Sequence, residues 1–302
     1  MHMAMAVRGF GGRLMSFDQY ENLEDLKRVQ SLCTQILGEL DRVCRKLDIH
    51  YVVYGGTAIG AVRHHGFIPW DDDVDVCMAR DDYERFLKEA PEEIGHEYLI
   101  INSRTEPCFP CTFSYMGLSE TFFVPEFYKE CEYKKPLSID VFPLDRVPGD
   151  RKSYRKQAFR TWLWGRLAYL RATSTPFLSF DGIKRSIVLA CCRIVHTLLV
   201  KFRINMRFIQ GKWDRAAQRF DDNSELTMFA DYCDADPLRW SISERDLFDT
   251  IDVPFESIMV KIPRAYDEIL TRGYGDYMTL PPVDQRKNHK PFLLDFGPYG
   301  KS

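Results

Sequence analysis

Four aspartates crowd into five positions of this chain: Asp71, Asp72, Asp73 and Asp75. The alternating run VDVCM at 74–78 predicts a strand, in which Asp73 and Asp75 point to one face while the intervening valines enter a core. Like charges at this spacing repel one another, and a buried carboxylate without a partner is strongly destabilising. Any fold that keeps these residues together therefore needs a compensating positive charge.

Two carboxylates side by side on a strand form a hard oxygen site that suits Mg²⁺ or Mn²⁺. Asp73 and Asp75 are therefore candidate metal ligands, and Asp71 and Asp72 are candidates to hold metal-bound waters or to orient a ligand. The alternative is an acidic turn in solvent. A third carboxylate is expected on a neighbouring strand. Asp140, within the apolar run LSIDVFPLD, is the candidate third ligand or general base, and a buried structural acid is its alternative.

A glycine pair precedes the aspartates. The run YVVY at 51–54 predicts a strand that ends at Gly55 and Gly56, and a short helix follows from Thr57 to Arg63. Bare backbone N–H groups at a helix start can approach a phosphate closely, so Gly55, Gly56 and Thr57 are candidate phosphate-binding residues. A glycine pair alone indicates only a turn. Arg63 is a further candidate for the phosphate, and a surface arginine is its alternative.

Hydrophobic periodicity predicts an α/β (α+β) fold, with a mixed β-sheet core, flanking helices and a mainly helical C-terminal half. Besides the two strands already named, strands are predicted at 98–102, 112–116 and 137–142. Helices are predicted at 22–47, 80–88, 151–170, 183–204 and 206–220. A last helix is expected to start near Pro263 and to stop near Gly273.

The net charge of −3 conceals an asymmetry along the chain. Between Arg151 and Arg219 sixteen Lys or Arg residues stand against two acids, a net charge of +14, which leaves −17 for the remainder. These basic residues are interleaved with apolar runs and match no nucleic-acid-binding motif, so we expect no nucleic-acid partner. Nine cysteines without regular spacing, and an N-terminal stretch without the apolar core of an export signal, predict reduced thiols and a cytoplasmic protein.

The apolar stretch at 183–204 is too short to span a bilayer and is interrupted by Arg193 and His196. On a helical wheel one face carries Ile187, Cys191, Ile194, Val195, Leu198 and Phe202. The opposite face carries Arg185, Arg193, His196, Arg203 and Arg207. Two interpretations remain: a surface helix packed on the protein's own core, or an interfacial helix that touches anionic lipid. The second would make 183–207 a peripheral contact at the inner face of the cell membrane.

Two smaller groups of residues have weaker signals. Cys108 and Cys111 in CFPC have the spacing of a zinc-binding pair, with Cys131 as a third candidate ligand. Without a second C-x-x-C pair or a paired histidine this motif indicates zinc only weakly. His64 and His65 end the glycine helix and are either site residues or plain surface residues.

Three blocks of the sequence resemble the signature blocks of the LicD family of phosphotransferases: GGTAIGAVRHHGFIPWDDDVDV, IDVFPLD and YGDYMTLPPVDQRKNH. That family resembles the catalytic region of fukutin-related proteins and belongs to the nucleotidyltransferase-fold superfamily. The resemblance implies a metal-dependent transfer of a phospho-alcohol, such as phosphocholine or a phospho-polyol, from a CDP-linked donor. The acceptor would be a hydroxyl of a cell-surface glycan or of its lipid-linked precursor.

The resemblance also implies roles for particular residues. The metal and base roles fall to Asp73, Asp75 and Asp140. Phosphate binding falls to Gly55, Gly56 and Thr57. The residues that the late block would bring to the donor are Arg286, Lys287 and His289.

We therefore expect a flexible leader at 1–20, a nucleotidyltransferase-like catalytic core at 21–150, a basic helical region at 151–240 and a C-terminal segment at 241–302 that returns to the active site. The alternative function is a nucleotidyltransferase that transfers NMP to a small hydroxylated acceptor, because the same carboxylates serve both reactions. An inactive binding module is a further alternative, and the intact aspartates argue against it.

Overall fold

A computed structural model describes residues 20, 22–178, 180–286, 288–289 and 291–300. The predicted leader lies outside them apart from Tyr20. The helices are α2 (Leu23–Leu47), α3 (Gly55–His64), α4 (Arg80–Glu89), α5 (Arg151–Ala172), α6 (Ile183–Lys201), α7 (Met206–Ala217), α8 (Glu244–Phe248) and α9 (Tyr266–Tyr274). The strands are β1 (Val52–Val53), β2 (Asp75–Ala79), β3 (Tyr98–Ile101), β4 (Ser114–Leu118), β5 (Phe122–Pro125), β6 (Ser138–Arg146), β7 (Met228–Ala230), β8 (Ile242–Ser243), β9 (Thr250–Phe255), β10 (Ile258–Pro263) and β11 (Pro291–Asp295).

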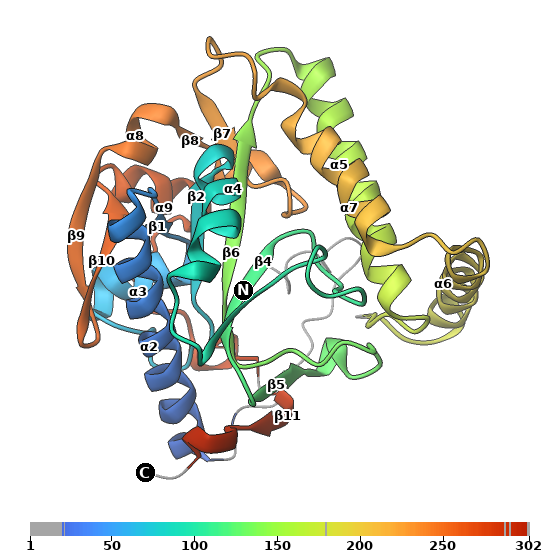
Figure 1. The fold of residues 1–302 in the computed structure, drawn as a ribbon, viewed down its shortest axis with the longest axis horizontal. Helices are drawn as coiled ribbons and strands as arrows, with labels where there is room; N and C mark the ends of the chain where they lie inside the picture. The colour runs from blue at the N-terminus through green and yellow to red at the C-terminus, as the bar shows by residue number, and fades with distance from the viewer. Residues whose placement is uncertain (1–19, 21, 179, 287, 290, 301–302) are drawn as a thin grey trace.

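The centre of the fold is a mixed sheet with the order β1-β2-β6-β4-β3, and β7 and β8 extend it beside the end of β6 (Figure 1). β2 and β6 run parallel, and their register pairs Asp75 with Asp140. β1, β4 and β3 join their neighbours antiparallel. This mixed sheet with flanking helices confirms the predicted fold class. Its parallel pair brings together two acidic residues that lie far apart in the sequence.

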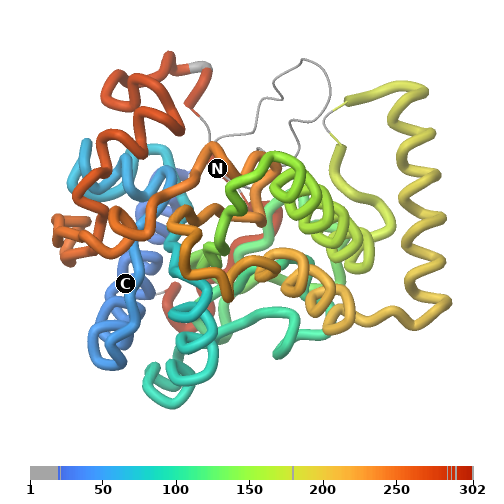
Figure 2. The backbone as a smooth tube through the Cα atoms, turned by 90° about the horizontal axis from the view of Figure 1, so that it is seen from above, coloured from blue at the N-terminus to red at the C-terminus, as the bar shows by residue number. Residues whose placement is uncertain are grey.

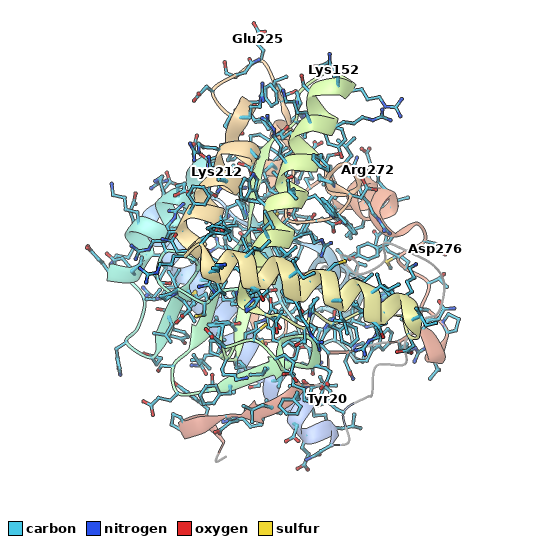
Figure 3. The ribbon with its side chains drawn as sticks, turned by 90° about the vertical axis from the view of Figure 1, so that its right-hand side faces the viewer. Tyr20, Lys152, Lys212, Glu225, Arg272 and Asp276 are labelled. Carbon is cyan, nitrogen blue, oxygen red and sulfur yellow. The ribbon has the colours of Figure 1, made fainter. Side chains whose placement is uncertain are left out.

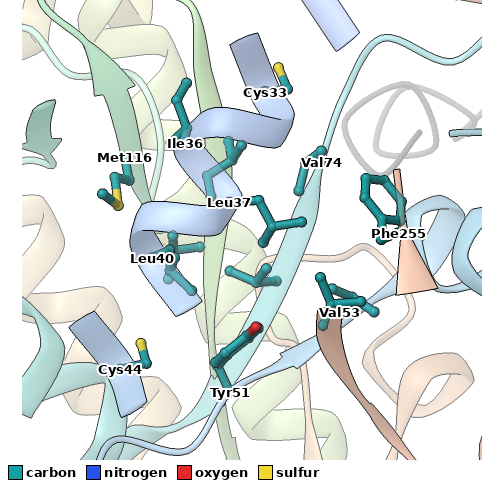
Figure 4. Packing of buried hydrophobic residues seen from close by; sticks show 14 of the residues in the cluster. Cys33, Ile36, Leu37, Leu40, Cys44, Tyr51, Val53, Val74, Met116 and Phe255 are labelled. Atoms are coloured by element: carbon teal, nitrogen blue, oxygen red, sulfur yellow. The ribbon is translucent and has the colours of Figure 1, made fainter. Parts of the chain in front are cut away.

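α2 covers one face of this sheet, and its sequence explains both of its ends. Asn22 accepts a hydrogen bond from the backbone N–H of Glu24, and the helix ends at Asp48, whose φ is 51°. Acidic residues fill its first turn and basic residues its last, as the helix dipole favours. Its apolar stripe is buried in the main core, where Figure 4 shows Ile36, Leu37, Leu40, Tyr51, Val74 and Phe255.

A buried ion pair joins the sheet to the helical half. Arg80 donates from Nε and Nη2 to the two carboxylate oxygens of Asp145, both at 2.7 Å. The guanidinium carbon of Arg80 lies 5.6 Å from the ring of Trp213 on α7. α7 in turn packs along α5, whose buried Gln157 donates to the carbonyl of Ala217 at 2.6 Å. The pair therefore fixes α7 and α5 against the ends of β2 and β6.

The last part of the chain contacts the first half at two places. β9 and β10 form a hairpin beside β1, and β11 pairs with β5. The prediction that the last helix starts near Pro263 is wrong, because Pro263 is the final residue of β10 and α9 begins at Tyr266. A proline is tolerated at the end of an edge strand, where its missing N–H leaves no ladder bond unmade.

Candidate active site

The acidic residues of β2 and β6 line a pocket at one end of the sheet. The Cα of Asp140 pairs with Asp75 on one side and with Tyr115 of β4 on the other, so three side chains stand in a row across the sheet. Asp73, just before β2, lines the same pocket, whose volume of about 580 Å³ includes space that is open to solvent. Val74 is fully buried in the core, as strand alternation predicts. The sequence therefore predicted correctly that Asp73 and Asp75 share a face.

Asp140 has a basic partner that the sequence analysis missed. The Nζ atom of Lys135 lies 3.1 Å from Oδ1 of Asp140 and 4.3 Å from the centre of the Tyr115 ring. Burial raises the pKa of Asp140, Lys135 opposes that rise, and the charge of Asp73 adds to it. Burial lowers the pKa of Lys135, but Asp140, with smaller contributions from Cys111 and Asp73, makes the net shift upward. Lys135 therefore supplies a built-in cation beside the carboxylates of the pocket.

A second cluster joins the aspartate run to the late block. Asp72 accepts hydrogen bonds from the backbone N–H of His289 at 3.0 Å, from its Nδ1 atom at 3.1 Å and from the Tyr20 hydroxyl at 2.9 Å. Asp71, Asp72 and His289 offer ligand atoms within 4.8 Å of one another, the metal-compatible group found among the described residues. His289 also lies 3.6 Å from Asp73. The late block therefore reaches the pocket through His289.

The glycine pair lies at the start of α3, next to this cluster. Gly55 has a φ of 56°, in the left-handed region that favours glycine. A Cβ atom on Gly56 would stand 2.9 Å from Oδ2 of Asp71, so that carboxylate packs against the bare backbone. The hydroxyl oxygen of Thr57 accepts the backbone N–H of Asp75 at 2.8 Å, which fixes the start of β2 to α3.

The other predicted basic residues have partners away from the carboxylates. Arg63 donates to the carbonyl of Tyr277 and, at 2.9 Å, to His64. Arg286 stacks over the ring of Trp70 at 4.7 Å. Lys287 lies outside the described residues. Of the predicted residues that the structure describes, the pocket lining contains Asp72, Asp73, Asp75, Asp140 and His289; it does not contain Asp71, Gly55, Gly56, Thr57, Arg63 or Arg286.

Aromatic residues form the remaining wall. Tyr115 and Tyr128 both line the pocket, and their hydroxyls lie 3.1 Å apart. The thiol of Cys111 forms hydrogen bonds with both hydroxyls, at 3.1 Å and 2.7 Å. The thiol of Cys108 instead donates to Glu132. The two cysteines of the C-x-x-C motif thus face different partners, and Cys111 holds the tyrosine wall in place.

Comparison with known proteins places these features in a family. Residues 48–148, which contain β1, β2 and β6, match the family described as LicD/FKTN/FKRP, nucleotidyltransferase domain. By the description of that family, this stretch is a domain of the nucleotidyltransferase type.

The match to individual proteins extends beyond that domain. The chain is 30% identical over 274 residues to the lipopolysaccharide cholinephosphotransferase LicD of Haemophilus influenzae, which covers 87% of this chain and 95% of that protein. An uncharacterized protein of Rickettsia typhi is 36% identical over 58 residues, 19% of each chain. An uncharacterized protein of Rickettsia prowazekii is 34% identical over 64 residues, 20% of this chain and 24% of its own. The chain belongs to the LicD family and is a transferase, which confirms the resemblance seen in its sequence blocks.

Proposed function

We propose that this protein transfers a phospho-alcohol, with phosphocholine as the first candidate, from a CDP-linked donor to a hydroxyl of a cell-surface glycan or of its lipid-linked precursor. The observation that carries the proposal is the pairing of Asp75 with Asp140 on parallel strands, with Asp73 in the same pocket. The name of the Haemophilus relative, a lipopolysaccharide cholinephosphotransferase, supports phosphocholine as the transferred group and a lipopolysaccharide as the acceptor.

The residues of the pocket fit a divalent cation. Carboxylate oxygens are the ligands that Mg²⁺ and Mn²⁺ prefer, and the lining includes four carboxylates, Asp72, Asp73, Asp75 and Asp140. Lys135 offsets only part of that negative charge. We propose that Asp73 and Asp75 hold the ion, with Asp140 as third ligand or general base. A bound ion would neutralise charge on the diphosphate of the donor.

In the proposed reaction the acceptor hydroxyl attacks the phosphorus that carries the alcohol. A P–O bond to the acceptor forms, the bond to the bridging oxygen of the diphosphate breaks, and CMP leaves with the electron pair. As general base the Asp140 carboxylate takes the hydroxyl proton, since it lines the pocket and burial raises its pKa, which makes it a stronger base. Lys135 keeps Asp140 in position, and His289 lies where it can contact the donor.

The released nucleotide tests the proposal. Incubation with CDP-choline, CDP-ribitol or CDP-glycerol and a glycan acceptor is expected to release CMP with one of the donors. Asp140→Asn is expected to abolish that release, whereas the control Asp81→Asn, an exposed acid of α4, should not change it. Release of pyrophosphate from a nucleoside triphosphate, with no CMP from any CDP-alcohol, would instead support the nucleotidyltransferase alternative, which the matched domain type favours.

A separate test is needed for which residues hold the metal ion, because Asp71, Asp72 and His289 form a second group that could bind it. Mn²⁺ binding followed by electron paramagnetic resonance should weaken strongly in Asp73→Asn and little in His289→Ala. The reverse ranking would move the metal to this second group.

A further inference from the structure

α6 has two apolar faces, and the protein covers only one of them. On the inner face Leu199 is buried, and Nδ1 of His196 lies 2.8 Å from the carbonyl oxygen of Leu170 on α5. The other face is exposed to solvent, with 46% to 82% of each side chain accessible, at Ile183, Ile187, Ile194, Leu198 and Phe202. These positions recur at the spacing of one helix face. The apolar stripe predicted from the sequence is therefore not packed on the protein's own core.

The position of α6 leaves this stripe accessible. In Figures 1 and 2 the helix lies at the outer edge of the molecule, and Figure 3 looks onto that side, where α6 crosses the front. Its principal helical neighbour in the structure is α5. Five large apolar side chains along one helix exceed the scattered exposed residues that a monomer normally carries.

The charges along this helix are almost all basic, apart from Asp181 just before it, which lies 4.0 Å from Arg185. Residues 183–207 contain no acid, and their six exposed basic residues are Lys184, Arg185, Arg193, Lys201, Arg203 and Arg207. A helix that combines an apolar face with a basic polar face is typical of helices that lie in the headgroup region of an anionic bilayer.

We propose that α6 docks this protein on the surface of an anionic lipid bilayer. The stripe would enter the headgroup region and the basic side chains would contact lipid phosphates. Among the described helices none is long and apolar enough to cross a membrane, so α6 would lie in the plane of the surface. A second copy of the chain fits less well, because Lys184 and Lys201 lie at the two ends of this face and an antiparallel two-fold pairing would bring them together.

Docking through α6 would also connect the membrane to the pocket. Tyr169 on α5 donates from its hydroxyl to the carbonyl of Phe127, a residue of the pocket lining, at 2.7 Å. The next residue, Leu170, is the contact of His196 on α6. α5 thus bridges the docking helix and the pocket wall. A lipid-linked acceptor would be presented near the pocket, a consequence that rests on the proposed function, whereas the docking itself does not.

Vesicle flotation tests the proposal with the full chain. We expect binding to vesicles of phosphatidylcholine with phosphatidylglycerol, weaker binding to phosphatidylcholine alone, and weakening by salt. Ile187→Ser/Ile194→Ser, which leaves the charge unchanged, should lower the partition coefficient by roughly tenfold or more. The matched control Leu99→Ser/Met259→Ser changes two exposed apolar residues of β3 and β10 and should bind as wild type does.

Three results would overturn the proposal. The first is failure of wild type to bind either vesicle, and the second is equal binding by wild type and the α6 variant. The third is a wild-type dimer in light scattering that the α6 variant dissociates, without vesicle binding, which would make a second copy the occupant. Circular dichroism and the thermal midpoint of both variants should match wild type, since all four residues are exposed.

Discussion

Replacing Lys135 by methionine tests the charge balance of the pocket. Methionine keeps most of the apolar length of the side chain and removes the ammonium. Coulomb's law at an effective dielectric constant of about 20 gives about 5 kcal/mol for two charges at the 3.1 Å separation of Lys135 and Asp140. Part of that energy only offsets the cost of removing the lysine ammonium from water. Methionine carries no charge and does not have this cost. The free energy of unfolding should therefore fall by about 2–4 kcal/mol.

Urea denaturation followed by tryptophan fluorescence measures this loss, and Mn²⁺ adds a second readout. With its cationic partner removed, the carboxylate of Asp140 should gain more from a bound cation, so Mn²⁺ should stabilise Lys135→Met more than it stabilises wild type. The control is Lys134→Met, since Lys134 is exposed and its ammonium contacts only the carbonyls of Lys129 and Cys131 among the described residues. A Lys135→Met variant as stable as the control, or an equal response of both to Mn²⁺, would refute the reasoning.

Three further changes have definite expected outcomes. Asp145→Ala leaves the buried guanidinium of Arg80 without its bidentate partner and should cost about 3–5 kcal/mol in urea denaturation. Gly56→Ala places a Cβ atom 2.9 Å from the carboxylate of Asp71, so that carboxylate must shift. Donor binding measured by calorimetry should therefore weaken about tenfold, while the thermal midpoint changes little. Burial, and then the charge of Asp145, raises the pKa of Asp221 to about 8, so the native state keeps a proton that the unfolded chain releases near pH 4. This stabilisation is present below about pH 4 and is lost as the pH rises to about 8, so Asp221→Asn should flatten the decline in thermal midpoint between about pH 5 and pH 8.

Features that depend on local periodicity could be predicted from the sequence. The start of α2 is within one residue of its predicted position, since its cap and its apolar stripe are both local signals. The shared face of Asp73 and Asp75 follows from the two-residue period of a strand, and the buried Val74 agrees with it.

Features that depend on the path of the chain could not be predicted. Lys134 and Lys135 are adjacent in sequence, yet one is exposed and the other is buried beside Asp140. The two lysines differ in burial because the chain passes close to β4, where Tyr115 lies beside Lys135. The pair of lysines five residues before Asp140 was the available signal, and composition alone does not say which of them turns inward.

α6 illustrates a related limit of prediction from the sequence. Periodicity identifies an apolar stripe on 183–204, but this helix has apolar residues around most of its circumference. The buried Leu199 and the exposed Ile194 are chemically alike, and the packing of α5 decides which side is covered. The pairing of β11 with β5 is equally non-local, because it joins a strand in the first half of the chain to one near its C-terminal end.

Calorimetric titration of CDP-choline into wild type and Asp75→Ala, each with and without Mg²⁺, tests the central proposal most directly. We expect wild type to bind CDP-choline in the presence of Mg²⁺ and to lose that binding when the metal is removed, and we expect Asp75→Ala to bind in neither condition. Binding that is indifferent to Mg²⁺ and unchanged in Asp75→Ala would contradict the assignment of a metal and a diphosphate to this pocket.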